Sequence, residues 1–409
     1  MSKISDYELI VGAEVINELK MLAKKLKGRV IQNINSTSVG GGVAEILGRM
    51  VPLLQDLGVD ARWDVLKGGE KYFQVTKKFH NALHGRKMEI TSDDYEIFLE
   101  TTKENIEQIE FYGDIIFIHD PQPVALVEKR RYLKSRWIWR CHIDFTSPDP
   151  EMWKFLKSFV EQYDACVFSA PSFARPLPIR QFLISPSIDP LSDKNRDLSE
   201  EEINNVLKRL KINRDKPIIT QISRFDYLKD PFGVIEAFHL VKKYVDCQLV
   251  LAGGGAIDDP EGQKVFQEVV EKASNDPDIL VLLLPPASDL EINALQRAST
   301  VILQKSLREG FGLTVAEALW KAKPVVASAV GGIPLQIAHK YSGLLSHTVQ
   351  GTAYWIRQLL HSPEYATRLG ENGKAHIKQN FLLTRHLRDY LLLFLSLEEE
   401  KDIIYLQKR

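Results

Sequence analysis

Residues 300–319 read TVILQKSLREGFGLTVAEAL and contain the three parts of a strand–turn–helix unit. The apolar run Thr300–Gln304 predicts a strand that is buried on both faces. Gly310 and Gly312 predict a tight loop after it, and the pattern indicates that a helix begins near Gly312. Because the unpaired N–H groups at the start of a helix attract anions, this turn is a candidate phosphate site.

Short apolar runs of the same kind alternate with amphipathic segments along the chain. Apolar strands of this type are typical of parallel sheets that helices cover on both faces, so the alternation predicts an α/β protein. The expected strands fall into two series: Arg29–Ile34, Arg62–Leu66, Asp114–Ile118, Trp137–Ile143, Ala165–Phe168 and Gln181–Ile184, then Pro217–Ile222, Gln248–Ala252, Ile279–Leu284, Thr300–Gln304, Pro324–Ser328 and Ser342–Leu345.

The segment between the two series, SPSIDPLSDKNRDLSEE at 185–201, has no hydrophobic period and is rich in Pro, Ser and Asp. Such a composition is typical of a linker. We therefore predict two Rossmann-like domains. The Leu-rich helix at the end of the chain is assigned to the first, so that the domains are residues 1–187 plus 382–409 and residues 188–381.

The bulk composition excludes several classes of protein. The 409 residues are 44% hydrophobic and 26% charged with a formal net charge of -1, so neither disorder nor nucleic acid as the main partner is expected. The three cysteines predict no disulfide framework and no zinc site. The absence of a signal-like start and of any long apolar run predicts a soluble, cytoplasmic protein without a membrane partner.

Two turns in the first half carry candidate groups for binding and catalysis. Gly40, Gly41 and Gly42 precede a predicted helix, where they either admit an anion or only form a tight turn. His119-Asp120 and His142 follow two neighbouring strands, where they can accept a proton from a hydroxyl group. Alternatively, Asp120 caps a helix that begins at the next residue, Pro121.

Two turns in the second half point to an anionic ligand. Arg224 and Lys229 follow the strand at 217–222, and two cations there suit a pyrophosphate, although they are equally consistent with solvated surface charges. Asp230 is expected to cap the next helix, with Pro231 as its first residue. In the turn at 306–319, Glu309 is a candidate for binding sugar hydroxyls and Glu317 for binding ribose. Alternatively, Glu309 is an exposed charge in the loop, and Glu317 is a carboxylate that complements the helix dipole.

The spacing E-G-F-G-L-x-x-x-E from Glu309 to Glu317 resembles the paired-glutamate motif of retaining glycosyltransferases with the GT-B fold. Ser223-Arg224-Phe225 with Lys229 resembles the donor-phosphate pair of that family. Gly40-Gly41-Gly42 resembles its N-terminal glycine loop, and His119-Asp120 with His142 its acceptor-side residues. This resemblance implies two Rossmann-like domains that face a central cleft, the first for the acceptor and the second for the donor.

The stretch Tyr72–Gly85, YFQVTKKFHNALHG, resembles trehalose glycosyltransferring synthases and the related trehalose phosphorylases. From its residues alone it predicts an amphipathic helix with Phe79 and Leu83 on one face. The resemblance implies synthesis of α,α-trehalose from UDP- or ADP-glucose and glucose, with retention at the anomeric carbon.

The resemblance also implies roles for individual residues. The catalytic set is Asp120, His142, Arg224, Lys229 and Glu309. The donor-binding set is Gly41, Gly42, Arg224, Lys229, Glu309, Gly310, Phe311, Gly312, Leu313, Thr314 and Glu317. The acceptor-binding set is His80, Asn81, His119 and Asp120. Neither a metal nor a cofactor is required, although Mg²⁺ is compatible with the scheme. The expected partners are sugars and a nucleotide sugar, and a homodimer is left open.

Three alternatives remain at this stage. The chain is a trehalose phosphorylase, which uses phosphate in place of a nucleotide; or it is a transferase with another sugar acceptor; or it is a nucleotide-sugar sensor without catalysis. The sensor would not need Asp120 and His142, so polar turns in both halves favour an enzyme.

Overall fold

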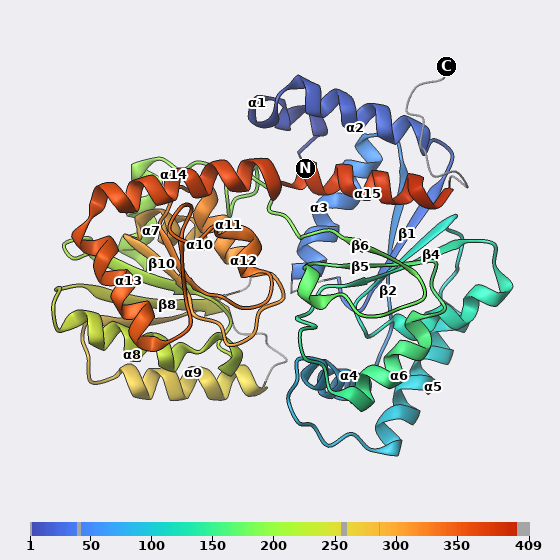
Figure 1. Cartoon of the computed structure of the whole chain (residues 1–409), viewed down its shortest axis with the longest axis horizontal. Helices are drawn as coiled ribbons and strands as arrows, with labels where there is room; N and C mark the ends of the chain where they lie inside the picture. Colours follow the sequence, from blue (N-terminus) through green and yellow to red (C-terminus); the bar gives the residue numbers. More distant parts are fainter. Residues whose placement is uncertain (1, 39–41, 255–259, 286, 399–409) are drawn as a thin grey trace. The chain divides into compact units, whose positions relative to one another are not determined.

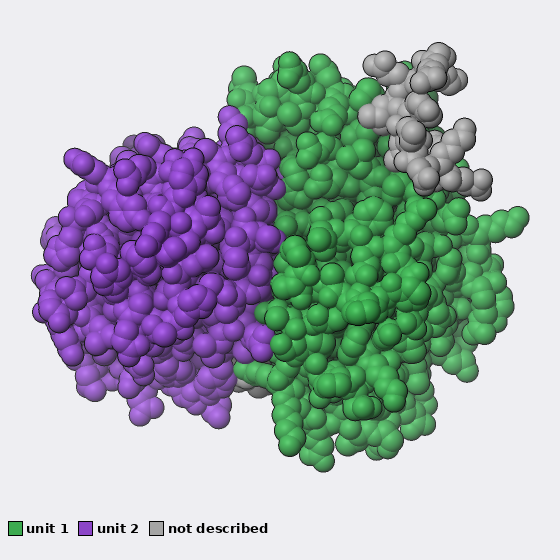
Figure 2. Space-filling model, viewed as in Figure 1, with its two compact units in different colours: residues 1–187, 383–409 green, residues 188–382 purple. Residues whose placement is uncertain are grey.

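The structure is a computed structural model of the chain and describes residues 2–38, 42–254, 260–285 and 287–398. The chain divides into two compact units (Figure 2): unit 1 is Met1–Ser187 with Leu383–Arg409, and unit 2 is Ile188–Leu382. Leu382, which the sequence analysis assigned to the first domain, belongs to unit 2, where it forms a parallel β-bridge with Ile188.

Unit 1 is built on a six-stranded sheet in the order β2-β1-β3-β4-β5-β6, and every neighbouring pair is parallel. Its strands are β1 (Val30–Asn35), β2 (Asp60–Val65), β3 (Ile115–His119), β4 (Arg136–Cys141), β5 (Ala165–Phe168) and β6 (Arg180–Leu183). The strand order reverses between β1 and β3, as in flavodoxin-like sheets.

Helices cover both faces of this sheet (Figure 1). The group that contains the last helix packs around Phe117, whose ring contacts Tyr390 and Phe394. That group is α2 (Ala13–Lys25), α3 (Gly42–Asp56) and α15 (Leu383–Glu398). The opposite group is α4 (Glu70–Leu83), α5 (Ser92–Gln108) and α6 (Pro150–Val160). Shorter elements are η1 (Ile4–Tyr7), α1 (Glu8–Val11), η2 (Val124–Tyr132) and η3 (Pro171–Phe173).

Unit 2 is built on a second six-stranded parallel sheet in the order β12-β11-β10-β7-β8-β9. Its strands are β7 (Ile218–Ile222), β8 (Gln248–Gly254), β9 (Ile279–Leu284), β10 (Val301–Gln304), β11 (Val325–Ser328) and β12 (Leu344–Ser346). Read from the other edge, this is the order of the dinucleotide-binding Rossmann fold, with the reversal between β7 and β10.

The central apolar strands of unit 2 bury both of their faces, as the sequence predicts, whereas the edge strand β9 leaves Leu283 half exposed. Ile219, Leu249 and Leu303 pack against α8 (Pro231–Lys242), α9 (Pro260–Ala273) and α13 (Val349–His361). Ile218 and Val250 face α7 (Glu200–Arg209) and α10 (Asp289–Ala298). The remaining elements are η4 (Tyr227–Lys229), α11 (Leu313–Trp320), α12 (Ile333–Gln336) and α14 (Pro363–Asn380).

Every strand that the sequence predicts is present, and so is the amphipathic helix α4, in which Phe79 and Leu83 are buried. Among the described residues, no helix combines the length and apolarity that a membrane span requires. The three cysteines are free and buried.

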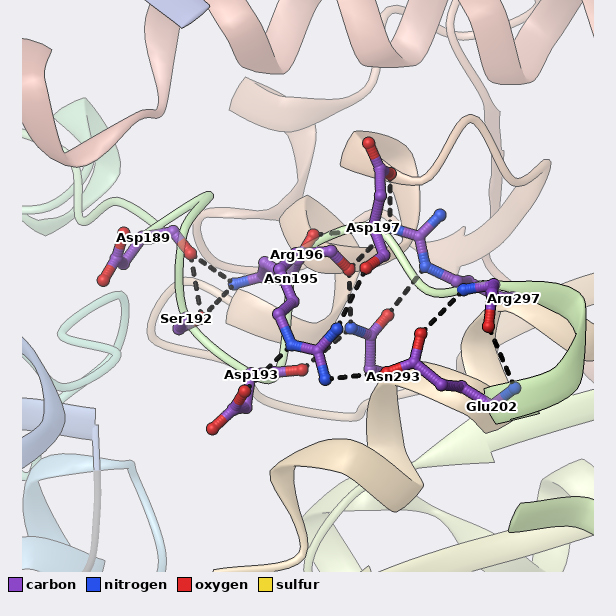
Figure 3. A network of polar contacts seen from close by, with 10 residues as sticks. Asp189, Ser192, Asp193, Asn195, Arg196, Asp197, Glu202, Asn293 and Arg297 are labelled. Atoms are coloured by element: carbon purple, nitrogen blue, oxygen red, sulfur yellow. Dashed lines mark hydrogen bonds and ion pairs between the residues drawn. The ribbon is translucent and has the colours of Figure 1, made fainter. Parts of the chain in front are cut away.

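The linker interpretation of 185–201 is wrong for most of that segment, which is a fixed part of unit 2 (Figure 3). The side chain of Asn293 on α10 donates to the carbonyl oxygens of Asp193 and Arg196, both at 2.8 Å. Arg297, one turn further, donates to the Arg196 carbonyl at 2.9 Å and to the Asp197 carboxylate at 2.8 Å. Backbone carbonyls of the segment are thus satisfied by side chains, which a hydrophobic pattern does not reveal.

We expect Asn293→Ala to weaken the attachment of this segment to α10, which Arg297 still maintains. Asn293 is fully buried, and the substitution removes three hydrogen bonds: the two to the segment and one that Asn293 Oδ1 accepts from Arg297 Nε at 2.9 Å. Their loss costs about 3 kcal/mol of unfolding free energy. Hydrogen exchange at residues 190–197 should rise, and the melting temperature should fall. The control is Asn372→Ala, which removes one solvent-exposed hydrogen bond to the Tyr341 carbonyl. Equal effects of the two substitutions would contradict the assignment.

Candidate active site

The strand orders locate two candidate sites, because ligands of open α/β sheets bind at the carboxyl ends of strands where the order reverses. In unit 1 the reversal lies between β1 and β3, and β3 ends at His119. In unit 2 it lies between β7 and β10. The turn after β7 contains Arg224 and Lys229, and the turn after β10 contains Glu309.

In unit 2, Lys229 and Glu309 are in direct contact although they are 80 positions apart in the sequence. Lys229 Nζ lies 2.6 Å from Glu309 Oε2. The same carboxylate oxygen accepts hydrogen bonds from Ser306 Oγ at 3.0 Å and Gln304 Nε2 at 3.2 Å. The Glu309 carboxylate is therefore held in one orientation by a cation and two neutral donors.

Gln221 on β7 fastens the two turns to each other. Its side-chain Nε2 donates to the Lys229 carbonyl, and its Oε1 accepts from the Lys305 backbone N–H, both at 2.8 Å. Asp230 caps α8 by accepting from Gly233 N at 3.0 Å, as predicted, and its carboxylate also pairs with Lys305. Gln221 and Lys305 are both buried and were missed by the sequence analysis.

The loop that carries Glu309 is pressed against two glycines after β11. At Gly331, φ is +55°, and an added Cβ would lie 1.6 Å from the Glu309 carbonyl oxygen. At Gly332, an added Cβ would lie 2.8 Å from the Gly310 carbonyl oxygen. Gly312 has φ +83°, which favours glycine, and the ring of Phe311 is buried. The loop conformation therefore depends on three glycines.

The helix α11 begins at Leu313, as the sequence predicts, with Gly312 at its N-cap. The N–H groups of Leu313 and Thr314 point to a ligand site because a helix offers its first residues no internal acceptor, whereas the Val315 N–H donates to the Gly312 carbonyl at 2.9 Å. Thr314 Oγ1 donates to Gln304 Oε1 at 2.9 Å, which ties the helix start to β10.

Glu317, further along α11, is buried and meets several charged or polar groups. Its Oε2 accepts from Gln296 Nε2 at 3.4 Å, and Lys194 Nζ lies 4.0 Å from its Oε1. Burial lowers the pKa of Lys321 to about 7, and the negative charge of Glu317 opposes part of that shift. Glu317 is thus anchored within unit 2, next to the segment that Asn293 holds.

Arg224 differs from Lys229 in its surroundings. Its side chain is about half exposed, at 53%, and lies 3.7 Å from the Asp226 carboxylate. It shares the turn after β7 with Lys229 but not the buried contact with Glu309. An exposed guanidinium on this edge is free to reorient towards a phosphate.

In unit 1, the buried His119 contacts the partly buried His142. His119 Nδ1 lies 3.1 Å from His142 Nε2, and His119 Nε2 lies 3.1 Å from Asn33 Oδ1. Asn33 Nδ2 donates to the Arg62 carbonyl, so its Oδ1 is the acceptor. His119 therefore donates from Nε2, and a neutral His119 accepts at Nδ1 from His142 Nε2–H. This tautomer leaves Nδ1 of His142 as an acceptor.

Both imidazoles are held in the neutral form. Burial, and to a smaller extent the nearby Arg140 guanidinium, lowers the pKa of His119 to about 3. Burial also places the pKa of His142 well below its usual value, with smaller contributions from Arg140, His119 and His386. The assigned tautomers therefore apply at physiological pH.

The interpretation of Asp120 as a helix cap is wrong. The next helical element, η2, begins at Val124 and has Pro123 at its N-cap. Instead, Asp120 Oδ1 accepts from the backbone N–H of His142 at 2.8 Å. Its φ of +71° permits this, and a non-glycine residue in that region is a reason to suspect a functional role. Burial raises the pKa of Asp120 to about 7, against the opposing effects of the His142 N–H and Arg140.

The other predicted residues of unit 1 lie outside this cluster of contacts or outside the described residues. His80 and Asn81 lie near the end of α4, where the ring of His80 contacts that of His84. Gly42 is the first residue of α3. Gly41 lies outside the described residues, as does most of the glycine turn.

No group of three or more His, Cys, Asp or Glu side chains among the described residues is placed to hold a metal ion. The candidate site of unit 2 is instead made of cations, amides, carboxylates and a helix start, and that of unit 1 of two histidines, an amide and one carboxylate. Such groups bind phosphates and hydroxyl groups.

Comparison with known proteins agrees with this chemistry. Residues 33–175 match the family model described as trehalose synthase, N-terminal domain, and residues 202–376 match that of glycosyl transferases group 1. The trehalose synthase of Pyrococcus horikoshii is 45% identical over 97% of this chain and 96% of its own length. The trehalose phosphorylase of Pleurotus pulmonarius is 28% identical over 84% of this chain but only 54% of its own length.

Among solved structures, an α,α-trehalose-phosphate synthase (UDP-forming) from Burkholderia xenovorans aligns with a TM-score of 0.73 and 15% identity. The alignment covers 90% of this chain and 100% of that one. At this identity the likeness shows the fold alone, and that fold is GT-B, as the sequence predicts.

We expect Gly331→Ala to displace the Glu309 loop. Alanine at a positive φ costs about 1 kcal/mol, and the clash with the Glu309 carbonyl adds about 1–3 kcal/mol. The control is Gly58→Ala, where φ is +85° and an added Cβ meets nothing within 4 Å, so only the first cost applies. Urea unfolding of both variants measures the difference; equal losses would show that the close approach is not needed.

Proposed function

We propose a reaction for this chain from the premise that it belongs to the trehalose synthase family of enzymes with the glycosyltransferase fold. In this proposal it transfers glucose from a nucleoside diphosphate glucose, UDP- or ADP-glucose, to a second glucose. The product is α,α-trehalose, and the configuration at the donor's anomeric carbon is retained.

The observation that carries the proposal is the Lys229–Glu309 contact at the strand-order reversal of unit 2, beside the start of α11. A sugar diphosphate needs positive charge at its phosphates and acceptors at its hydroxyl groups. Lys229, Arg224 and the N–H groups of α11 offer the first, and the Glu309 carboxylate offers the second. Glu317 is assigned to the ribose hydroxyls of the nucleotide.

The proposed mechanism is a same-face substitution. The bond between the anomeric carbon and the diphosphate oxygen breaks, and a bond from the acceptor oxygen to the same carbon forms. The departing diphosphate takes the proton of the acceptor hydroxyl. Arg224 and Lys229 stabilise the charge that develops on the diphosphate, so the enzyme acts mainly by positioning and electrostatics.

The polar groups of unit 1 take roles that match their hydrogen-bonding capacity. Asp120 in its ionised form accepts from the acceptor's hydroxyl group. His142 has an acceptor at Nδ1 in the tautomer assigned above, which suits a donor-sugar hydroxyl near C6. His119 fixes that tautomer through Asn33. His80 and Asn81 are assigned to the acceptor on the family resemblance of α4 alone.

We expect Arg224→Ala to lower turnover by about 10²–10³-fold, the usual scale for loss of one charge-stabilising group. Because Arg224 is half exposed, the substitution should leave the fold intact. The control is Arg214→Ala, which removes an exposed arginine that pairs with Glu200 on α7. A steady-state assay of trehalose formation measures both; unchanged turnover in Arg224→Ala would exclude its role in the donor site.

The phosphorylase alternative has support from the Pleurotus pulmonarius relative, although this chain spans about half of that protein. A phosphorylase uses phosphate and has no need of a ribose-binding Glu317. Titration calorimetry of the wild type and Glu317→Gln with UDP, ADP and phosphate separates the two. We expect wild-type binding of UDP or ADP that weakens in Glu317→Gln. Binding of phosphate alone would favour the phosphorylase.

The identity of the acceptor needs a separate test, since the donor cluster carries no information about it. A matrix of UDP- and ADP-glucose against glucose, glucose phosphate and fructose phosphate, with NMR of the product, decides it. The expected product has equivalent anomeric protons because an α,α-1,1 linkage is symmetric. Any other linkage would point to a transferase with another acceptor, and no turnover of any donor would point to a sensor.

A further inference from the structure

Arg140 is a fully buried cation in unit 1 that neither the sequence analysis nor the proposed mechanism uses. It is the fifth residue of β4, in the otherwise apolar run WIWRC at 137–141. Its carbonyl oxygen accepts from the Asp120 N–H at 2.7 Å, and it is paired in register with His119 on β3. The backbone of Arg140 is therefore fixed beside His119 and Asp120, two residues of the candidate acceptor site.

The guanidinium of Arg140 is incompletely hydrogen-bonded. Nη2 donates to Ser169 Oγ at 3.3 Å, whereas Nε and Nη1 have no hydrogen-bond partner among the described residues. No carboxylate in the described part of the chain lies within ion-pair distance of it. A buried guanidinium without direct pairing is costly, and its field acts strongly on neighbours because little solvent screens it.

The groups that face Arg140 come from three elements. On and after β3 they are His119 and Asp120, and at the end of β4 they are Cys141 and His142. On α15 they are Arg385, His386 and Tyr390, with Asp389 paired to Arg385 at 2.8 Å. The charge of Arg140 thus acts on Asp120, and in the described part of the chain no ion pair joins the Asp120 carboxylate to a cation.

We propose that Arg140 is a positioning residue of the acceptor site: its field favours the ionised form of the Asp120 carboxyl group and adds to the burial that keeps the imidazoles of His119 and His142 neutral. This inference rests on the proposed function, in which ionised Asp120 accepts a hydrogen bond from the acceptor hydroxyl. Arg140 itself contacts no substrate in this scheme. It acts through the protonation state of groups that do.

The direction of the effect follows from the sign of the charge. Burial raises the pKa of Asp120, and two effects oppose that rise, first the hydrogen bond from the His142 N–H and then the positive charge of Arg140, leaving the pKa at about 7. Removal of the charge therefore moves the pKa of Asp120 upward, so that the carboxyl group is protonated at neutral pH. The same removal raises the pKa values of His119 and His142.

The test is the pH profile of kcat/KM for the wild type, Arg140→Met and Arg140→Lys. The wild type should lose activity as pH falls through about 7. In Arg140→Met the acid limb should move up by about one unit, which lowers activity about tenfold at pH 6 while the values converge at about pH 9. Arg140→Lys keeps the charge and should restore most of the wild-type profile.

The matched control is Arg385→Met. Arg385 is also a buried guanidinium facing this cluster, but Asp389 pairs with it directly. Its loss should lower stability without moving the acid limb. A uniform loss of activity at every pH in Arg140→Met, or the same loss in Arg140→Lys, would overturn the proposal and leave Arg140 with a purely structural role.

A measurement that does not depend on turnover separates this inference from the proposed reaction. In the full chain labelled with ¹³C-aspartate, the Asp120 carboxyl signal is assigned by its absence in Asp120→Asn and then titrated. Its apparent pKa should be higher in Arg140→Met than in the wild type. An unchanged Asp120 pKa would refute the role of Arg140 even if trehalose is formed. A raised pKa without any trehalose synthesis would instead refute the proposed reaction alone.

Discussion

The parallel pairing of β7 with β10 is the constraint on which the candidate donor site depends. These strands are separated by a long stretch of chain, yet Leu303 pairs with Gln221 in register. Because parallel strands end at the same edge, the turns that follow them meet there. Lys229 and Glu309 come into contact as a consequence. The β1–β3 pairing has the same effect in unit 1, where it brings Asn33 to His119.

Polar residues at or near the carboxyl ends of β1, β7 and β10 then fix the geometry of these edges. Gln221 joins two turns, Gln304 orients the Glu309 carboxylate, and Asn33 sets the tautomer of His119. All three are buried, where a polar group is costly unless it is hydrogen-bonded. The identity of each of these residues is therefore determined by its hydrogen-bond partners. Arg140 is also a buried polar residue near the end of a strand, but its hydrogen bonding is incomplete.

The strands and the start of α11 can be predicted from the sequence, because buried strands and glycine turns have recognisable local patterns. The strand order, which determines where the sites lie, cannot be predicted in this way because it depends on pairing between segments that are distant in the sequence. The interpretations of 185–201 and of Asp120 failed for one reason: both concern polar groups whose partners lie far along the chain. A buried polar residue ending an apolar strand was the available signal for Gln221 and Arg140, and it was not used.

The two carboxylates at the candidate sites are placed in opposite electrostatic situations. One oxygen of the Glu309 carboxylate accepts hydrogen bonds from a lysine and two neutral donors, so its negative charge is compensated before any ligand binds. Asp120 receives one backbone N–H and the field of a guanidinium that does not touch it. A sugar hydroxyl can replace one of several donors around Glu309 with little change in its charge state. At Asp120, by contrast, hydrogen bonding to a hydroxyl group depends directly on whether the carboxyl group is ionised.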